Sequence, residues 1–260
     1  NLYEITPFGI NLEGLWLNIE ETQNRLKEFM HDERDSLGTD SGKHLLNSPE
    51  ILSALGEMDA IFPIIHGTNG EDGKLQGFLD LVGIPYVGAG VAASALGMDK
   101  ALMRNNFESA GIPQPKYLIF SNNDQEHLDD NITKQIEKNI GYPCFIKPCN
   151  GGSSIGVSKV LSREDLGSAW GLAKQYDQKV IIEEIMRGRE LECAVIGNNS
   201  LLVSGVAEIR TSEEFYTYSA KYSDSSTELI LPADIKSETL QKIQNYAINA
   251  FQAIDCSGLA

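Results

Sequence analysis

The chain has 260 residues, of which 42% are hydrophobic, so it can bury more than one core and we expect two or three domains. Its net charge of −16 argues against a nucleic acid or an anionic membrane as the main partner, although a few lysines can still converge on a small anion. No apolar run reaches the ~18 residues that a membrane span needs, so we expect no span. We expect no signal peptide either. The cysteines form no CxxC pair and fit no zinc spacing, so we predict free thiols in a reducing cytoplasm at Cys144, Cys149, Cys193 and Cys256.

The first fifty residues mix apolar positions with turn-forming ones. We expect a pair of strands within residues 1–17, a short helix over residues 19–30 and a polar loop over residues 31–49. Thr22 and Asn24 lower the helix propensity of the second of these segments.

An almost continuous apolar run over residues 59–65 predicts a strand buried on both faces of a parallel sheet. Pro63 cannot donate to a strand ladder, so it indicates an edge or the end of that strand. A loop over residues 66–73, a helix over 74–81 and a strand over 84–87 follow. This order indicates an α/β arrangement, in which ligands bind at loops that leave the carboxyl ends of strands.

Two side chains in this half occupy positions that favour ligand binding. His66 follows the apolar run, where it is either a loop cap or a ligand-binding group. Asp99 is a good N-cap for a helix that ends at Gly111 and Pro113. Lys100 then places a cation in the first helical turn, which is favourable if an anion binds beside it. A solvated lysine fits the same position, so both interpretations stay open.

The middle of the chain contains a predicted hairpin over residues 145–160 with a Gly/Ser tip. Lys147 lies just before the tip, and Ser153 and Ser154 add hydroxyl groups within it. Successive N–H groups in a glycine-rich turn can form a concavity for anions, which indicates a lid over nucleotide phosphates. From this stretch alone, an ordinary glycine-rich hairpin fits as well.

The other predicted elements of the second half are, in chain order, a strand near 117–120, a helix around 133–139, a helix after a capping box at Ser162–Asp165, strands over 179–186, 191–196 and 200–209, and a helix over 237–254. Trp170 belongs to the apolar stripe of the helix after the capping box, so we interpret it as a core residue. Residues 213–222 are rich in aromatic residues and lysine, which is more typical of an active-site loop than of a core strand.

Three carboxylates gather near the end of the strand over 179–186. Glu183 and Glu184 lie on that strand, and Glu190 follows it. We expect an acidic strand edge here, which could accept hydrogen bonds from the amino group of a base and from ribose hydroxyls. A charged edge that prevents aggregation would explain the same residues.

The absence of three well-known motifs argues against several common kinds of active site. The chain has no GxSxG, no GxxxxGK[ST] and no GxGxxG after a strand, so a serine-hydrolase elbow, a P-loop and a dinucleotide Rossmann site are not expected. Lysines stand instead in three separate segments, at Lys100, Lys147 and Lys221. Together with the Gly/Ser lid and the acidic strand, they fit ATP held between two small sheets.

Several motifs then follow one another in a fixed order over about 160 residues: His66–Gly77, Gly83–Gly88, Ser94–Lys100, Gly111–Pro113, Ile146–Val160, Glu183–Glu184 and Phe215–Tyr222. With these motifs the chain resembles the D-alanine–D-alanine ligases of the ATP-grasp superfamily. The resemblance implies an α/β (α+β) ATP-grasp fold in three parts. These are an N-terminal substrate-side α/β domain over residues 1–98, incomplete at its start, a central domain with the lid over 99–187, and part of a C-terminal domain over 188–260.

The resemblance also implies an activity, the ADP-forming ligation of two D-alanines through an acyl phosphate, which serves peptidoglycan synthesis, cell wall biogenesis and cell shape. The implied ATP-binding residues are Lys100, Lys147, Ser153, Ser154, Glu183, Glu184, Ile185, Glu190 and Lys221, with the lysines on phosphates, Glu183 and the Ile185 backbone on adenine, and Glu190 on ribose. His66 and Ser153 would lie near the first D-alanine. Tyr222 would link the Lys221 loop to Ser153 and close the site against water, which makes Ser153, Lys221 and Tyr222 the implied catalytic residues.

Two departures from the family pattern limit what the resemblance implies. We expect a segment before Asn1 and another after Ala260, and the ligands of Mg²⁺ (or Mn²⁺) are expected in the latter, with none within the chain. The alternatives are a D-alanine–D-serine ligase and a nucleotide-binding ATP-grasp fragment that is inactive as truncated. A biotin-carboxylase-like ligase is disfavoured by the His66 and Tyr222 motifs, and the Lys221–Tyr222 pair favours D-alanine over D-lactate. A homodimer in the cytoplasm is expected by resemblance.

Overall fold

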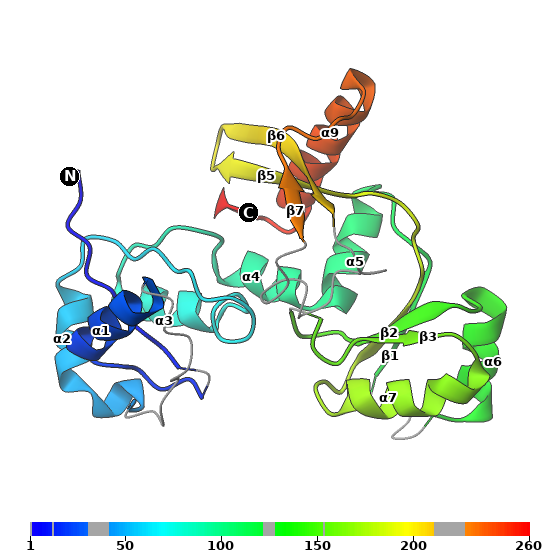
Figure 1. Ribbon diagram of the computed structural model, residues 1–260, viewed down its shortest axis with the longest axis horizontal. Helices are drawn as coiled ribbons and strands as arrows, with labels where there is room; N and C mark the ends of the chain where they lie inside the picture. Colours follow the sequence, from blue (N-terminus) through cyan, green and yellow to red (C-terminus); the bar gives the residue numbers. More distant parts are fainter. Residues whose placement is uncertain (1, 12, 31–41, 122–127, 153, 211–226) are drawn as a thin grey trace. The chain divides into compact units, whose positions relative to one another are not determined.

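The computed structural model divides into two compact units. One contains Asn1–Ile61 and Asp80–Pro85, and the other contains Phe62–Leu79 and Tyr86–Ala260. The residues that the structure describes are 2–11, 13–30, 42–121, 128–152, 154–210 and 227–260 (Figure 1). Over these ranges, no helix combines the length and the apolarity required to cross a bilayer.

The smaller unit consists of helices and irregular segments where it is described. Its elements are α1 (Ile19–Met30), the short 3-10 helix η1 (Leu45–Asn47) and α2 (Pro49–Gly56). The predicted helix over 19–30 is confirmed, and Thr22 supports it rather than weakening it. The Thr22 hydroxyl donates to the Asn18 carbonyl at 2.9 Å and accepts from the Gly9 N–H at 3.0 Å, so it fastens the preceding segment to the helix. Helix α2 was not predicted, and it begins where Pro49 provides a preorganised first turn.

The strands predicted in the first part of the chain are mostly wrong. The pair expected within residues 1–17 is reduced to one antiparallel bridge between Ile10 and Trp16. The run over 59–65 forms no regular strand, and Phe62 and Ile64 are 62% and 73% exposed rather than buried. Pro63 has no N–H to give to a ladder, and the contact with the next predicted strand is one bond from the Ile61 N–H to the Pro85 carbonyl at 2.8 Å.

Three helices precede the first sheet of the larger unit in the sequence. They are α3 (Lys74–Val82), α4 (Val91–Met98) and α5 (Lys100–Ser109). Helix α3 confirms the predicted helix over 74–81. Helix α4 was not predicted, because residues of its Ala-rich sequence give no clear polar face. Asp99 caps α5 as expected, since its carboxylate accepts from the N–H groups of Ala101 and Leu102 at 3.0 and 3.3 Å.

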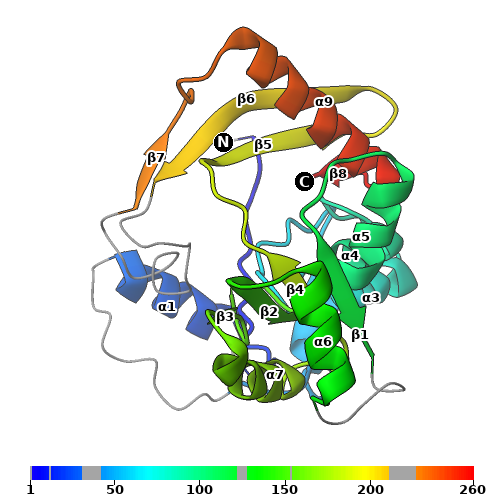
Figure 2. The same cartoon turned by 90° about the vertical axis from the view of Figure 1, so that its right-hand side faces the viewer.

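A four-stranded antiparallel sheet follows, in the order β1-β4-β2-β3. Its strands are β1 (Tyr117–Phe120), β2 (Cys144–Pro148), β3 (Ser158–Val160) and β4 (Val180–Glu184), and its helices are α6 (Asp130–Asn139) and α7 (Leu166–Lys174), the latter after a short 3-10 turn η2 (Arg163–Asp165). Figure 2 shows α6 and α7 on one face of this sheet. The predicted hairpin is therefore confirmed as β2 and β3, and the capping box at Ser162 and Asp165 is present.

The core of this sheet lies between the strands and the helices α6 and α7. Ile146, Val180 and Ile182 point into it and are fully buried, together with Ile136 of α6. Trp170 of α7 is 3% exposed, and its ring meets that of Phe120 edge to face at 5.8 Å. The interpretation of Trp170 as a core residue is confirmed.

Side chains alternate between the two faces of a strand, so the neighbours of these core residues point the other way. Ile181 and Cys149 pack there against Ala101 of α5, which covers this second face. Lys147 and Glu183 have the same parity on their strands as Phe145 and Ile181, so the sheet presents them towards α5.

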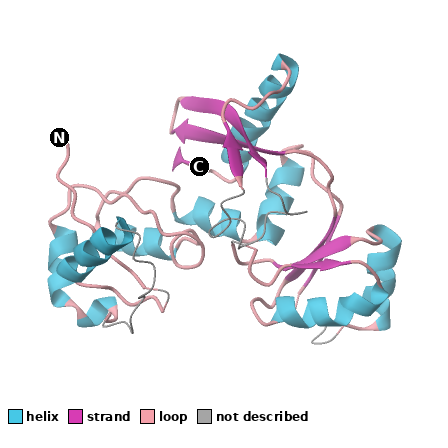
Figure 3. Ribbon diagram, viewed as in Figure 1, coloured by secondary structure: helices cyan, strands magenta, loops and turns pink. Residues whose placement is uncertain are grey.

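A second antiparallel sheet lies in the last part of the chain, in the order β7-β6-β5-β8. Strands are drawn in magenta in Figure 3. Its strands are β5 (Glu190–Gly197), β6 (Leu201–Arg210), β7 (Glu228–Ile230) and β8 (Gly258–Leu259), and α9 (Ser237–Ala253) packs against it. The strands predicted over 191–196 and 200–209 and the helix over 237–254 are confirmed. On β6, the buried Glu208 carboxylate is held by Arg189 at 2.7 Å and by Arg210 at 3.0 Å.

Candidate functional site

The carboxylate of Glu183 is the centre of a charged cluster between β4, β2 and α5. Glu183 is 4% exposed, and a different cation binds each of its oxygens. Lys147 Nζ donates to Oε2 at 2.5 Å, and the Arg104 guanidinium donates to Oε1. Burial raises the pKa of Glu183, but Lys147 and Arg104 outweigh that effect and hold the pKa below 4.5. The carboxylate is therefore ionised at neutral pH, with both oxygens engaged.

Lys100 lies one helical turn before Arg104, on the same side of α5. Its ammonium group donates to the carbonyl oxygen of Gly151 at 2.6 Å, at the start of the Gly/Ser tip. Burial lowers the pKa of Lys100, and the positive charge of Lys147 lowers it further. Two ammonium groups thus share one half-buried space, and an anion placed between them would relieve their repulsion.

The charged cluster around Glu183 therefore carries more positive than negative charge. Lys100, Arg104 and Lys147 contribute three cations, whereas Glu183 and Asp177 contribute two carboxylates that act on Lys100. This local surplus stands out in a chain whose net charge is −16. A site of this kind suits a ligand with several negative charges, such as a nucleotide triphosphate, at the end that faces the lysines.

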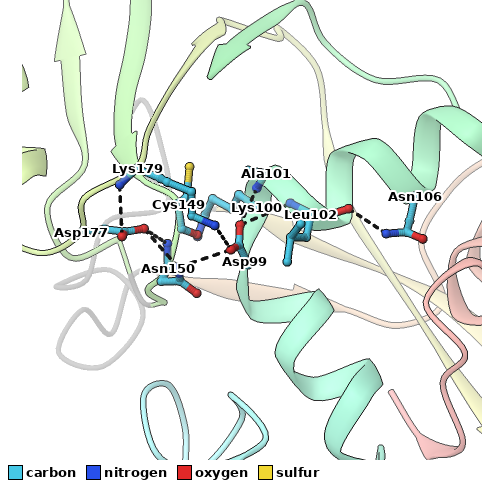
Figure 4. A network of polar contacts seen from close by, with 9 residues as sticks. All are labelled: Asp99, Lys100, Ala101, Leu102, Asn106, Cys149, Asn150, Asp177 and Lys179. Atoms are coloured by element: carbon cyan, nitrogen blue, oxygen red, sulfur yellow. Dashed lines mark hydrogen bonds and ion pairs between the residues drawn. The ribbon is translucent and has the colours of Figure 1, made fainter. Parts of the chain in front are cut away.

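A network of polar contacts fixes the place where α5 meets the tip (Figure 4). The Asn150 N–H donates to Asp177 Oδ2 at 2.7 Å, and the Asn150 amide lies 3.2 Å from the same oxygen and 3.5 Å from Asp99 Oδ2. Lys179 forms an ion pair with Asp99, and the Lys100 N–H donates to the carbonyl of Cys149 at 3.0 Å. Asp99 thus caps the helix and also ties the first turn of α5 to the root of the tip.

The tip itself has the backbone of a tight glycine turn. Gly156 has a φ of 71°, and a Cβ at this position would lie 2.6 Å from the ring of Tyr176. Ser154 has a φ of 60°, which is uncommon for a residue other than glycine. A Cβ on Gly152 would lie 3.7 Å from the Cα of Gly67, so the tip approaches the loop that follows His66. Glycine is therefore required at Gly156, where both the positive φ and the nearby Tyr176 ring disfavour a side chain.

The remaining predicted site residues that the structure describes lie outside the charged cluster around Glu183, and some of them are exposed. His66 is exposed, with its Nδ1 3.8 Å from Glu71 Oε1. Glu184 accepts from the Lys116 N–H at 2.7 Å, which fixes the end of β4. Ile185 is half-buried just after β4, and Glu190 is exposed at the start of β5. Ser153, Lys221 and Tyr222 lie outside the described residues.

One prediction about this region is corrected. We expected Glu183 and Glu184 on an exposed acidic edge, whereas β4 is an interior strand that pairs with β1 on one side and β2 on the other. The edge interpretation followed from the charges alone. A carboxylate can occupy an interior strand here because Arg104 and Lys147 compensate its burial.

Arg104 and Asp177 were not recognised from the sequence. Arg104 stands four residues after Lys100, a spacing that places two cations on one face of a helix and could have identified it. Asp177 stands two residues before Lys179 in a turn and has no comparable signal. Within the described ranges, no group of three or more His, Cys, Asp and Glu side chains could hold a metal ion, so we assign no metal site to them.

Replacing Asp99 with asparagine is expected to reduce stability, because the variant keeps a cap acceptor but loses the ion pair with Lys179. Burial raises the pKa of Asp99, whereas Lys179 and the N–H groups of Leu102 and Ala101 lower it below 3.8 overall. The stabilisation is therefore present at neutral pH and is lost as the pH falls through that lowered pKa. Chemical unfolding should show a deficit of about 1.5–3 kcal/mol at neutral pH that shrinks in acid. An equal deficit at both pH values would contradict the role of the ion pair.

Comparison with known proteins decides the family. The model described as "D-ala D-ala ligase C-terminus" matches residues 107–260, and the one described as "D-ala D-ala ligase N-terminus" matches residues 1–89. The chain belongs to the D-alanine–D-alanine ligase family. A D-alanine–D-alanine ligase of Geobacillus kaustophilus is 46% identical over 263 residues, which cover 99% of this chain and 72% of the relative. One of Bacillus pumilus is 43% identical over 262 residues, with coverage of 99% and 72%.

Solved structures of ligases support the ATP-grasp fold that the sequence predicted. The VanG D-Ala:D-Ser ligase from Enterococcus faecalis matches with a TM-score of 0.75 and 34% identity, over 98% of this chain and 74% of that one. The D-alanine–D-alanine ligase from Coxiella burnetii matches with a TM-score of 0.66 and 32% identity, over 78% of this chain and 53% of that one.

Proposed function

We propose that this chain is an ATP-dependent, ADP-forming ligase that joins two D-alanines to D-alanyl-D-alanine for peptidoglycan synthesis. The observation that carries the proposal is the surplus of positive charge around Glu183, where Lys147 binds the carboxylate and Lys100 binds the first carbonyl of the glycine-rich tip. The family and the curated relatives, which are named D-alanine–D-alanine ligases, supply the reaction.

ATP would lie between the lysines and the carboxylates of this cluster. Its phosphates would be held by Lys100, Lys147 and Lys221, with Ser153 and Ser154 closing the tip over them. Its adenine would meet Glu183 and the backbone at Ile185, and Glu190 would reach the ribose, with Glu184 next to Glu183 on the same strand. Catalysis then depends mostly on positioning and on the neutralisation of phosphate charge.

The reaction proceeds in two steps. A carboxylate oxygen of the first D-alanine attacks the γ-phosphorus, the bond from that phosphorus to the bridging oxygen breaks, and ADP leaves. The neutral amine of the second D-alanine then attacks the acyl carbon, phosphate departs with the electron pair of the C–O bond, and the nitrogen loses a proton. His66 and Ser153 would lie near the first D-alanine, and Tyr222 would help to exclude water.

Several further assignments are part of the same proposal. We propose Mg²⁺ (or Mn²⁺) as the metal that accompanies ATP, where it would neutralise phosphate charge, although the described residues offer no site for it. We also propose a cytoplasmic homodimer that acts on D-alanine and ATP, with neither a nucleic acid nor a membrane as partner. A D-serine-preferring ligase is not favoured, because the curated relatives that match over nearly the whole chain, at 46% and 43% identity, are named D-alanine–D-alanine ligases.

Phosphate release by the full-length protein tests the proposal. With ATP and Mg²⁺ present, we expect release when D-alanine is added and only background release with L-alanine or without an amino acid. Release with L-alanine, or no release with D-alanine, would contradict the ligase assignment. A protein that binds ATP but releases no phosphate with any of these would instead support a nucleotide-binding module.

A further inference from the structure

Arg104 is held in place more firmly than a surface arginine of α5 would be. Its side chain is 15% exposed, and its guanidinium donates to Gln114 Oε1 at 3.2 Å. The Gln114 amide in turn donates to the Arg104 carbonyl at 2.9 Å, and the guanidinium lies 5.7 Å from the centre of the Tyr117 ring. These contacts do not involve Glu183, so they hold Arg104 in addition to its ion pair with the carboxylate.

The two cations on Glu183 differ in what else they can do. Lys147 lies near the end of β2, and the Lys100 ammonium group donates to the carbonyl oxygens of Cys149 and Gly151, two and four residues further along, at 3.5 and 2.6 Å. The proposed function needs Lys147 to bind a phosphate there. Arg104 has no such task and stays on Oε1. A movement of Lys147 to a phosphate would leave Oε2 without this cation, while Arg104 would remain on Oε1.

We propose that Arg104 is a positioning residue for nucleotide-base selection, which keeps Glu183 anionic and aimed so that the oxygen released by Lys147 accepts a hydrogen bond from the amino group of adenine. This inference rests on the proposed function and deepens it. A fixed carboxylate accepts from an amino group and repels a carbonyl oxygen, so it favours a 6-aminopurine over a 6-oxopurine.

Removing Arg104 should change that selection in a particular way. Without it, Lys147 would be the remaining cation bound to Glu183, so moving Lys147 to a phosphate would leave a buried carboxylate uncompensated. The carboxylate would then stay with Lys147 or take up a proton. A protonated carboxyl can donate to a 6-oxo group, so the preference for adenine should fall more than nucleotide binding as a whole.

The experiment compares ATP with ITP, which carries an oxygen in place of the 6-amino group, as substrates of the full-length protein. Values of kcat/KM for both nucleotides are measured with D-alanine for the wild type, Arg104→Met, Arg104→Lys and Glu183→Gln. Arg163→Met is the matched control, because Arg163 pairs with Asp130 and Glu137 on the opposite side of the sheet, among α6 and η2. Circular dichroism and the unfolding midpoint show whether each variant is folded.

We expect Arg104→Met to reduce the ratio of kcat/KM for ATP to that for ITP by about tenfold or more, the loss that follows from ~1.4 kcal/mol of discrimination. Glu183→Gln should reduce it similarly, since an amide can donate to the oxygen of ITP, whereas Arg104→Lys should restore part of it and Arg163→Met should leave it unchanged. An equal loss for ATP and ITP, or an unchanged ratio in a folded Arg104→Met variant, would overturn the inference. A wild type that turns over neither nucleotide would instead count against the proposed function.

Discussion

Replacing Lys147 with alanine is expected to weaken ATP binding by well over tenfold. A charge-assisted contact to a phosphate is worth about 1.5–3 kcal/mol, and each ~1.4 kcal/mol corresponds to a factor of ten. The substitution also removes one of the two cations that bind Glu183. Glu183 keeps Arg104 as its partner, so the carboxylate stays compensated and the variant is expected to fold. The loss therefore reports on the phosphate contact rather than on a collapsed site.

Titration of the full-length protein with a fluorescent ATP analogue measures this loss, and competition with unlabelled ATP confirms it. Lys134→Ala is the matched control, because Lys134 is an exposed lysine on α6, whose apolar side packs on the other face of the same sheet. The control should bind ATP like the wild type. An ATP affinity of Lys147→Ala within twofold or so of the control would remove Lys147 from the nucleotide site.

Replacing Trp170 with alanine is expected to destabilise the domain that contains it by about 3–5 kcal/mol. Trp170 is 3% exposed and fills the space between α7 and the sheet, where it meets Phe120. Ala169 and Ala173 beside it are too small to occupy the vacated volume. Since β2 and β4 form the other side of the same core, the lysine and the carboxylate on their opposite faces depend on this packing.

Urea unfolding followed by circular dichroism checks the prediction. Leu161→Ala is the control, since Leu161 follows β3 and is 63% exposed, and the cost there should stay within about 0.5 kcal/mol. A loss below about 1 kcal/mol at Trp170 would mean that the core between α7 and the sheet collapses easily around the gap. In that case, the face that carries Lys147 and Glu183 would be less dependent on the helical face than the structure indicates.

Local signals in the sequence predicted most of the second half of the fold. Asp99 was recognised as a cap because a short acceptor just before an apolar stripe satisfies the free N–H groups of a first turn. The hairpin followed from two β-prone runs around a Gly/Ser tip, and the helix with Trp170 followed from its periodicity. Each of these depends on neighbours within a few residues, which the sequence displays directly.

The failures concern contacts between distant parts of the chain. The apolar run over 59–65 was assigned to a buried strand from composition, but the burial of Phe62 and Ile64 depends on partners that composition does not reveal. For the same reason, the sequence predicts an edge where β4 is an interior strand, since the pairing of β1 with β4 joins residues about sixty positions apart. Arg104 shows how this affects the site. Its spacing from Lys100 was visible, but its partner Glu183 stands 79 residues away.

The formation of D-alanyl-D-alanine tests the account most directly. The full-length protein is incubated with ATP, Mg²⁺ and D-alanine, and the dipeptide and ADP are quantified in the same samples by chromatography. We predict one dipeptide for each ADP, and a rate for Lys147→Ala that is well over tenfold lower than for Lys134→Ala at ATP concentrations below saturation. ADP without dipeptide, or dipeptide formed equally fast by both variants, would contradict the assignment of this cluster as the ATP site of a D-alanine ligase.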